Sequence, residues 1–303
     1  MFGVSRKALR PWQSALFDAN SWLAALDDLQ AALTPGSGVI DSDDFRDTRA
    51  RAQADRLAAG PEDWNRWSMR MTALRGQCAG DPATLALWEA VALADFSGQT
   101  HEWPAEFPVL EFPGRVDFSN TIFKADAFFN AVHFRGEADF AGAVFARRAY
   151  FENAEFGAGA SFAHVLFGGS TQFREARFRG HVNFSDAEFQ HDVWFRGSRF
   201  GASVIFADAR FHGDAGLGNC AFDGFVDFSR TTFDDAAGLD SARFGSVVSF
   251  RQASFGGKLW LNDASFGADV DLAHARFASD VIVDGASQAK GGTAIAALAR
   301  RRG

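Results

Sequence analysis

Large apolar residues recur at every eleventh position along most of the chain, in two interleaved series. One series runs from position 118 to 283 and the other from 123 to 277, and together they hold 26 Phe, four Leu and one Val. Steps between successive positions alternate between five and six, as in "VNFSDAEFQHDVWFRGSRF" at 182–200. Amphipathic helices repeat their apolar residues every three or four positions and simple strands every two, so neither explains this spacing.

A second restriction accompanies the first. The residue two positions before each large one is Ala, Val, Thr, Ser or Cys at 30 of the 31 positions, with Leu259 as the exception. Residues two apart in a strand point to the same side. The pattern therefore predicts short strands that each send one large and one small side chain inward, which fills a narrow interior without voids.

The true repeat is twice as long as the step within each series, so its period is 22. Leu replaces Phe at 217, 239 and 261, which are two steps apart, whereas the positions halfway between them remain Phe. A unit with the 11-residue spacing of one series holds only two short strands, and two strands cannot enclose a Phe-filled interior. We therefore expect a mainly β fold made of four-sided coils, about eight of them, stacked one strand spacing apart.

The repeat resembles that of the pentapeptide-repeat family, in which a small residue, a polar residue and Leu or Phe recur in order. Segments that carry the resemblance are "ADF" (138–140), "NAEF" (153–156), "DAEF" (186–189) and "NDASF" (262–266). The resemblance implies a right-handed quadrilateral β-helix over about residues 105–285. Here every second unit has a sixth residue, often beside Gly, where we expect a bulge or a wider corner.

The flanking segments differ from the repeat. Residues 1–100 predict a helical domain or N-terminal cap, with helices over 20–33, 42–60, from Pro61 onward, and over 81–96. The β-helix is assigned to residues 101–285. Residues 286–303 are expected to form a short basic helix or a loose tail, which either caps the last coil or mediates a homodimer through the C-terminal end.

Function is expected on the outward side chains, which form columns at period 22. An aromatic column holds Phe128, Tyr150, Trp194 and Trp260, and an acidic column holds Asp117, Asp139, Asp227 and Asp271. The aromatic column is either a partner site, since Trp and Tyr are frequent in binding hot spots, or stacking that steadies the coils. The acidic column is either functional or an ordinary solvated surface.

Three outward aliphatic residues in the first coils suggest a covered surface. Ile122, Val144 and Leu166 precede polar residues in the same column, and we predict that the N-terminal helices dock on this aliphatic patch. The alternative is that all three are simply β-favouring residues at the surface.

The remaining chemistry points away from an enzyme. His164 and Asp186 lie one coil apart and could orient a general base or contribute to a metal site, but an ordinary surface ladder is the favoured explanation. No P-loop, Rossmann, GxSxG or HExxH motif is present. We expect no catalytic residues, no cofactor and no metal.

Composition restricts the class of ligand and the cellular compartment that we expect. The net charge of −8 argues against direct nucleic-acid binding. Cys78 and Cys220 lie far apart without metal spacing, no apolar run is long enough for a membrane span, and the N-terminus lacks the apolar core of a signal peptide. These features favour the cytoplasm.

The preferred prediction is a non-enzymatic scaffold that binds a protein partner of unknown identity. Two alternatives remain open. The resemblance implies that the chain could mimic DNA, bind a type II topoisomerase such as gyrase and protect it from inhibitors. Otherwise, the N-terminal helices carry an unrecognised activity that the rod positions.

Overall fold

The computed structural model describes residues 43–78, 80, 82–289 and 292–299. The chain divides into two compact units. The first comprises Met1–Asp95 with Glu111–Arg115, and the second comprises Phe96–Leu110 with Val116–Gly303. The predicted helix over 20–33 lies outside the described residues.

Within the described residues 43–95, the first unit is built on three helices. They are α3 (Asp43–Ala59), α4 (Pro61–Cys78) and α5 (Pro82–Ala92), accompanied by strands β1 (Ala94–Asp95) and β4 (Glu111–Phe112). Gly60, with φ of 101°, ends α3 in a conformation that suits glycine, and Pro61 then begins α4 without losing a needed N–H. The sequence predicts a helix over 81–96, but α5 ends at Ala92 because the chain enters β1.

Tryptophan side chains hold the first unit together. Trp64 is fully buried, donates a 2.8 Å hydrogen bond from Nε1 to the carbonyl oxygen of Glu111, and packs edge-on against Phe112 at 5.2 Å. Trp88 donates to the Met71 carbonyl at 2.7 Å, joining α5 to α4. These bonds satisfy polar atoms that would be costly to bury alone.

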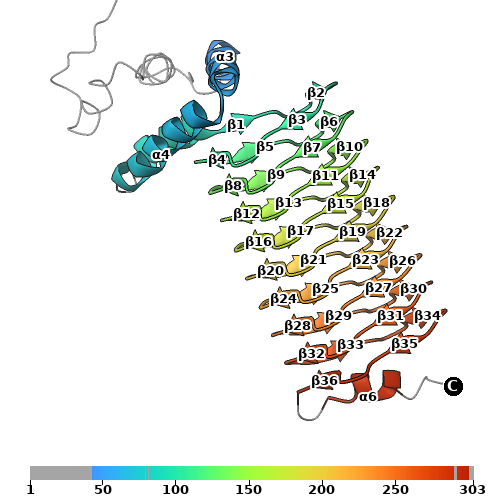
Figure 1. Ribbon diagram of the computed structural model, residues 1–303. Helices are drawn as coiled ribbons and strands as arrows, with labels where there is room; N and C mark the ends of the chain where they lie inside the picture. The colour runs from blue at the N-terminus through green and yellow to red at the C-terminus, as the bar shows by residue number, and fades with distance from the viewer. Residues whose placement is uncertain (1–42, 79, 81, 290–291, 300–303) are drawn as a thin grey trace, which may run out of the picture. The chain divides into compact units, whose positions relative to one another are not determined.

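The second unit is a four-sided solenoid of two-residue strands in four parallel sheets (Figure 1). Sheet A runs from β5 (Val116–Asp117) to β33 (Val270–Asp271), and sheet B from β2 (Thr100–His101) to β34 (Arg276–Phe277). Sheet C runs from β3 (Ala105–Glu106) to β35 (Val281–Ile282), and sheet D from β8 (His133–Phe134) to β36 (Ser287–Gln288). Neighbouring strands of a sheet are one predicted period apart in the chain, which confirms both the period and the four sides.

Sheets B and C each contain nine strands, so the solenoid has about nine turns where the sequence predicted about eight. The additional turn was missed because His101, the register partner of Phe123, stands in a position that Phe fills in later turns of sheet B. At the other end, Gln288 occupies the corresponding position in sheet D. Its Oε1 accepts a hydrogen bond from the Ile295 N–H, in the short helix α6 (Ala294–Ala299), at 3.3 Å.

The interior is an ordered stack of aromatic rings. Phe162 and Phe184, one turn apart on sheet A, stack with 4.8 Å between centroids and 7° between planes. Phe162 also meets Phe173 of the sheet C column edge-on, at 5.4 Å and 86°. Both geometries are favoured by aromatic quadrupoles, so the inward residues specify the packing and leave only the outward ones for recognition.

The five- and six-residue steps form two kinds of corner. After sheets A and C, five-residue steps form hydrogen-bonded turns, as where the Thr121 N–H donates to the Phe118 carbonyl at 3.1 Å. The third residue of these turns has positive φ in glycine and non-glycine residues alike, for instance 67° at Gly142 and 55° at Val109, as in a type II turn. The six-residue steps are wider corners marked by bends.

Candidate interaction surface

The outward side chains lie in columns, because strands one turn apart pair in register. The outward residue is the second of each strand in sheets A and C and the first in sheets B and D. Successive members of a column are separated by one strand spacing of about 4.8 Å. The acidic column therefore lies on sheet A, the aliphatic patch on sheet B and the aromatic column on sheet C.

The aromatic column is interrupted. Phe128 and Tyr150 stack with 5.0 Å between centroids and 2° between planes. Gln172 separates them from Trp194, whose indole lies across Gly216 so closely that a Cβ there would be 2.3 Å from the ring. Trp260 lies beyond Gly238. The column thus offers one stacked pair and two separate indoles, all half-buried.

A cation accompanies most rings of this column. Arg148 lies 5.7 Å from the Tyr150 ring, Arg174 lies 5.7 Å from the Trp194 ring, and Lys258 lies 5.8 Å from the Trp260 ring. These are cation–π distances. Sheet C therefore combines aromatic faces with neighbouring positive charge.

The side chains of the acidic column have a local structural role. The Oδ1 atoms of Asp117 and Asp139 each accept a 3.0 Å hydrogen bond from the N–H two residues later, and those of Asp227 and Asp271 accept the same bond at 2.8 Å. Asn183 does the same with a neutral amide oxygen. This is the Asx-turn geometry, which stabilises the corner after each of these sheet A strands.

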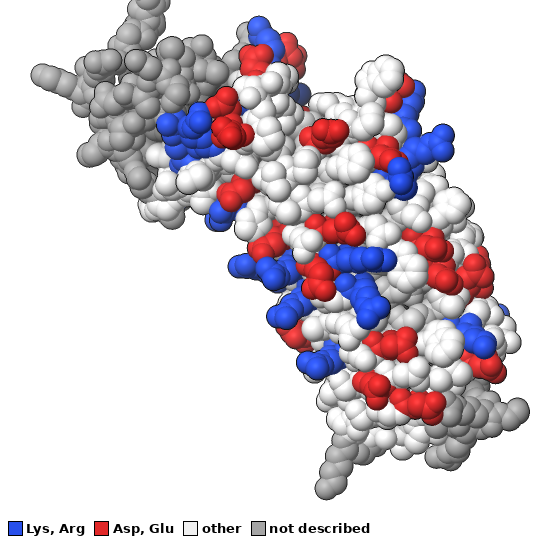
Figure 2. All heavy atoms as spheres, viewed as in Figure 1, with Lys and Arg blue, Asp and Glu red and all other residues white. Residues whose placement is uncertain are grey.

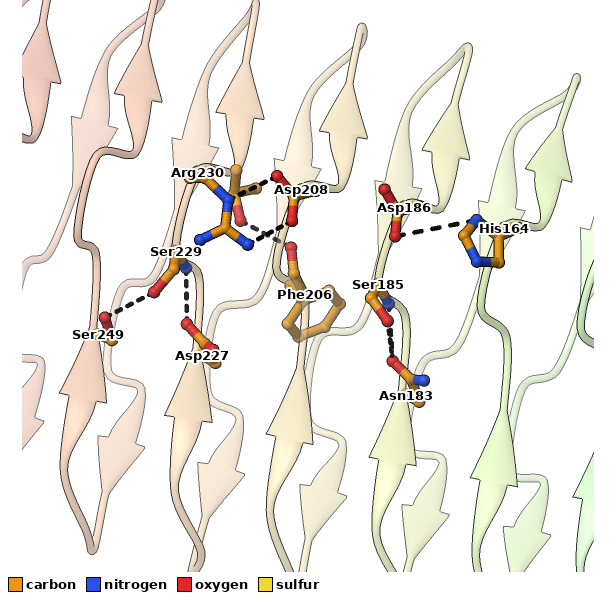
Figure 3. Close-up of polar contacts among 11 residues, drawn as sticks. His164, Asn183, Ser185, Asp186, Phe206, Asp208, Asp227, Ser229, Arg230 and Ser249 are labelled. Atoms are coloured by element: carbon orange, nitrogen blue, oxygen red, sulfur yellow. Dashed lines mark hydrogen bonds and ion pairs between the residues drawn. The ribbon is translucent and has the colours of Figure 1, made fainter.

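Two pairs of polar side chains lie on these same corners (Figure 3). His164 and Asp186 approach to 3.8 Å, with side chains 70% and 50% exposed. Arg230 donates to both carboxylate oxygens of Asp208, at 2.7 and 2.5 Å, and this lowers the pKa of Asp208. All four residues have positive φ at the corner, so each of them is also a turn residue.

Opposite charges separated by one turn face each other repeatedly along the solenoid. The pairs are Glu102–Lys124 at 2.7 Å, Asp126–Arg148 at 2.6 Å, Glu155–Arg177 at 2.8 Å and Asp208–Arg230 at 2.5 Å. Figure 2 shows the result on one face, where acidic and basic side chains are interspersed and Lys and Arg gather across its middle. That face carries no continuous acidic stripe among the described residues.

Arg177 and Arg199 of sheet D form an arginine block together with Arg174 and Arg196, two corner residues that the strand columns read from the sequence do not include. Arg177 and Arg199 are register partners on β16 (Arg177–Phe178) and β20 (Arg199–Phe200). Arg174 and Arg196 occupy equivalent positions in the preceding corners, and all four side chains are exposed. Reading the corner residues at period 22, as was done for the strands, would have revealed the block.

The aliphatic patch is a register-aligned group on sheet B. Ile122 pairs with Val144 and Val144 with Leu166, and Ile122 is 38% exposed while the other two are half-buried. Docking of the N-terminal helices on this patch stays a prediction.

Other candidate chemistry is sparse in the described residues. No group of three or more His, Cys, Asp and Glu side chains there is arranged to hold a metal. No helix in the described ranges is both long and apolar enough to cross a membrane. Cys220 is buried, and its burial raises the pKa of its thiol to about 12, which keeps it protonated and unreactive at neutral pH.

Comparison with known proteins agrees with this architecture. A family model described as pentapeptide repeats (9 copies) matches residues 129–176, 162–210 and 228–276. The matches begin at Phe129, Phe162 and Phe228, all of which belong to the apolar series that starts at Phe118. No curated protein and no solved structure matches the chain. The four-sided solenoid, the regular repeat and this match show that residues 129–210 and 228–276 of the chain consist of pentapeptide repeats.

Proposed function

We propose that the protein is a non-enzymatic scaffold that binds a protein partner through the aromatic column of sheet C. The observation that carries the proposal is the combination of half-buried rings and adjacent cations on one rigid face. Trp, Tyr and Arg are the residue types most enriched in binding hot spots. A solenoid holds them at regular spacing, so little conformational entropy is lost when a partner binds.

The geometry of Trp194 supports docking rather than stacking alone. Its indole covers Gly216 of the next turn, and at Gly238, one turn further, the nearest atom to an added Cβ would be 3.7 Å away. Because Gly216 and Gly238 have no side chains, neither position covers the Trp194 side chain, which is half-buried. Such a flat, partly apolar surface suits a protein surface better than an enclosed small molecule.

Partner capture from native cells tests this proposal. The full chain and a Trp194→Ala/Trp260→Ala variant serve as baits, and we expect the variant to lose the partner. Trp103→Ala is the matched control, because Trp103 is 82% exposed but lies outside the aromatic column. Equal capture by all three baits would overturn the role of the aromatic column.

No specific observation favours the topoisomerase-binding alternative. The acids of the acidic column act as turn acceptors, and Asn183 fills the same role without charge. A gyrase supercoiling assay with a quinolone present remains its direct test, with restored supercoiling as the result that would establish it. An activity in the N-terminal helices likewise has no described feature in its favour.

A further inference from the structure

The arginine block departs from the ion-pair pattern seen along much of the solenoid. At other turns, outward cations such as Arg148 and Arg230 face an acid one turn away. Arg199 instead faces Arg177 on one side and Ala221 on the other. Arg196 stands between Arg174 and Gly218 at equivalent corner positions. Two successive turns therefore present arginines at the same two positions.

The acids near the arginine block do not neutralise Arg196 and Arg199. Glu155 accepts hydrogen bonds from Arg177 at 2.8 Å and Arg179 at 3.3 Å, and His133 contacts it as well. The Glu175 carboxylate lies over Gly197, where an added Cβ would be 2.4 Å from its Oε1. In the described part of the chain, the guanidinium groups of Arg196 and Arg199 make no ion pair and no hydrogen bond with another side chain.

This arrangement is unfavourable for folding alone. Like charges on directly opposed strand positions destabilise a sheet, and an acid at position 221 would offset the repulsion. Sequences that break a local rule without a compensating contact do so most often at functional sites. The unpaired guanidinium groups therefore point to a ligand that supplies the missing negative charge.

The arginine block adjoins the aromatic column. Arg174 lies over the Trp194 ring at 5.7 Å, and the corner containing Arg196 directly follows Trp194 in the chain. We infer that Trp194 and the arginine block together bind an acidic segment of a protein partner. Guanidinium groups bind carboxylates with paired hydrogen bonds, while the indole takes an apolar side chain of the same segment.

A peptide fits this surface better than a nucleic acid. The protein carries a net charge of −8, which disfavours a polyanion lying along many turns. The block spans only two turns, a width of about 5 Å between strands, which accommodates one extended segment. The inference rests on the proposed scaffold function and adds the charge of the partner to it.

The test uses the full chain and a fluorescein-labelled oligo-glutamate peptide, with fluorescence anisotropy at low ionic strength. We expect saturable binding that weakens as salt is added. An Arg196→Gln/Arg199→Gln variant should bind about tenfold more weakly or worse. Arg210→Gln/Arg276→Gln is the matched control, because it removes two outward sheet B arginines and the same charge, and it should bind like the wild type.

Several outcomes would overturn the inference. They are no binding of the peptide, equal losses in both double variants, or tighter binding of a labelled DNA duplex through the same arginines. If the Gln variant is unstable, Arg196→Lys/Arg199→Lys replaces it, and binding as tight as that of the wild type would then count against guanidinium recognition. Loss of partner capture by the tryptophan variant with full capture by the arginine variant would overturn this inference and leave the scaffold function standing.

Discussion

The imidazole of His101 stacks on the Phe123 ring, with 5.1 Å between centroids and 8° between planes. It occupies the position that Phe fills throughout the rest of sheet B. Its Nε2 atom is buried and has no hydrogen-bond partner among the residues that the structure describes, and burial lowers the pKa of the imidazole. The first turn therefore contains a polar group that the aromatic interior does not satisfy.

Replacing His101 with Phe should raise the free energy of unfolding by about 1 kcal/mol, because a buried unsatisfied polar atom is removed and ring stacking is kept. The pKa of His101 in the folded protein lies below the usual 6.5, so the unfolded chain takes up the proton first as pH falls. The free energy of unfolding of the wild type therefore declines as pH falls below about 6.5. Urea denaturation at pH 8 and pH 5.5 would check this. A smaller gain at pH 5.5 than at pH 8 would contradict it.

The repeat was predictable because it is a steric constraint that recurs at every turn. Phe at intervals of five and six, with a small residue two before, admits only a narrow four-sided coil, and the sheet registers agree. The first turn was less visible because His101 interrupts the Phe series. The acidic column was predicted as surface, but its acceptor role depends on the backbone dihedral angles of the corners after sheet A. The residue types conceal these angles, because His164 and Arg230 also have positive φ there.

Substitutions at Asp227 separate charge from turn geometry. Asp227→Asn keeps the oxygen that accepts from the Ser229 N–H, so stability should stay within about 0.5 kcal/mol of the wild type. Asp227→Ala removes the acceptor and should lower the free energy of unfolding by about 0.5–1.5 kcal/mol. Chemical denaturation measures both. Equal losses in the two variants would show that the charge, rather than the acceptor, matters.

Gly180 tests the close approach of neighbouring turns at the wide corners. A Cβ there would lie 2.4 Å from the carbonyl carbon of Ala158, which is backbone and cannot move aside. Gly180→Ala should therefore lower the free energy of unfolding by about 1–3 kcal/mol. Gly238→Ala is the control, because the atom nearest to an added Cβ there is Asp240 Oδ2 at 3.7 Å. The free energy of unfolding of this variant should not fall. Thermal unfolding of both variants decides the point.

Arg199 tests whether the arginine block is under electrostatic strain. Arg199→Gln removes repulsion from Arg177 and should raise the free energy of unfolding by about 0.2–1 kcal/mol at low salt, with a smaller gain at high salt. Arg210→Gln is the control, because Arg210 faces Glu188 in register and its removal should not stabilise the fold. If both variants were more stable than the wild type, the gain would not come from relief of the repulsion between Arg199 and Arg177.

Glu155 should make the solenoid sensitive to acid. Its hydrogen bonds with His133 and Arg177 lower its pKa below the usual 4.5, against the opposing effect of partial burial. A lowered folded pKa means that the unfolded chain takes up the proton first as pH falls, so the stabilisation is complete above about pH 4.5 and is lost below it.

Glu155→Gln should therefore be less stable than the wild type at pH 7, and the difference should shrink towards pH 3. Urea denaturation across that range measures it, with Glu137→Gln, which removes an exposed corner carboxylate, as the control. A difference that stays constant with pH would mean that the two bonds do not favour the ionised carboxylate.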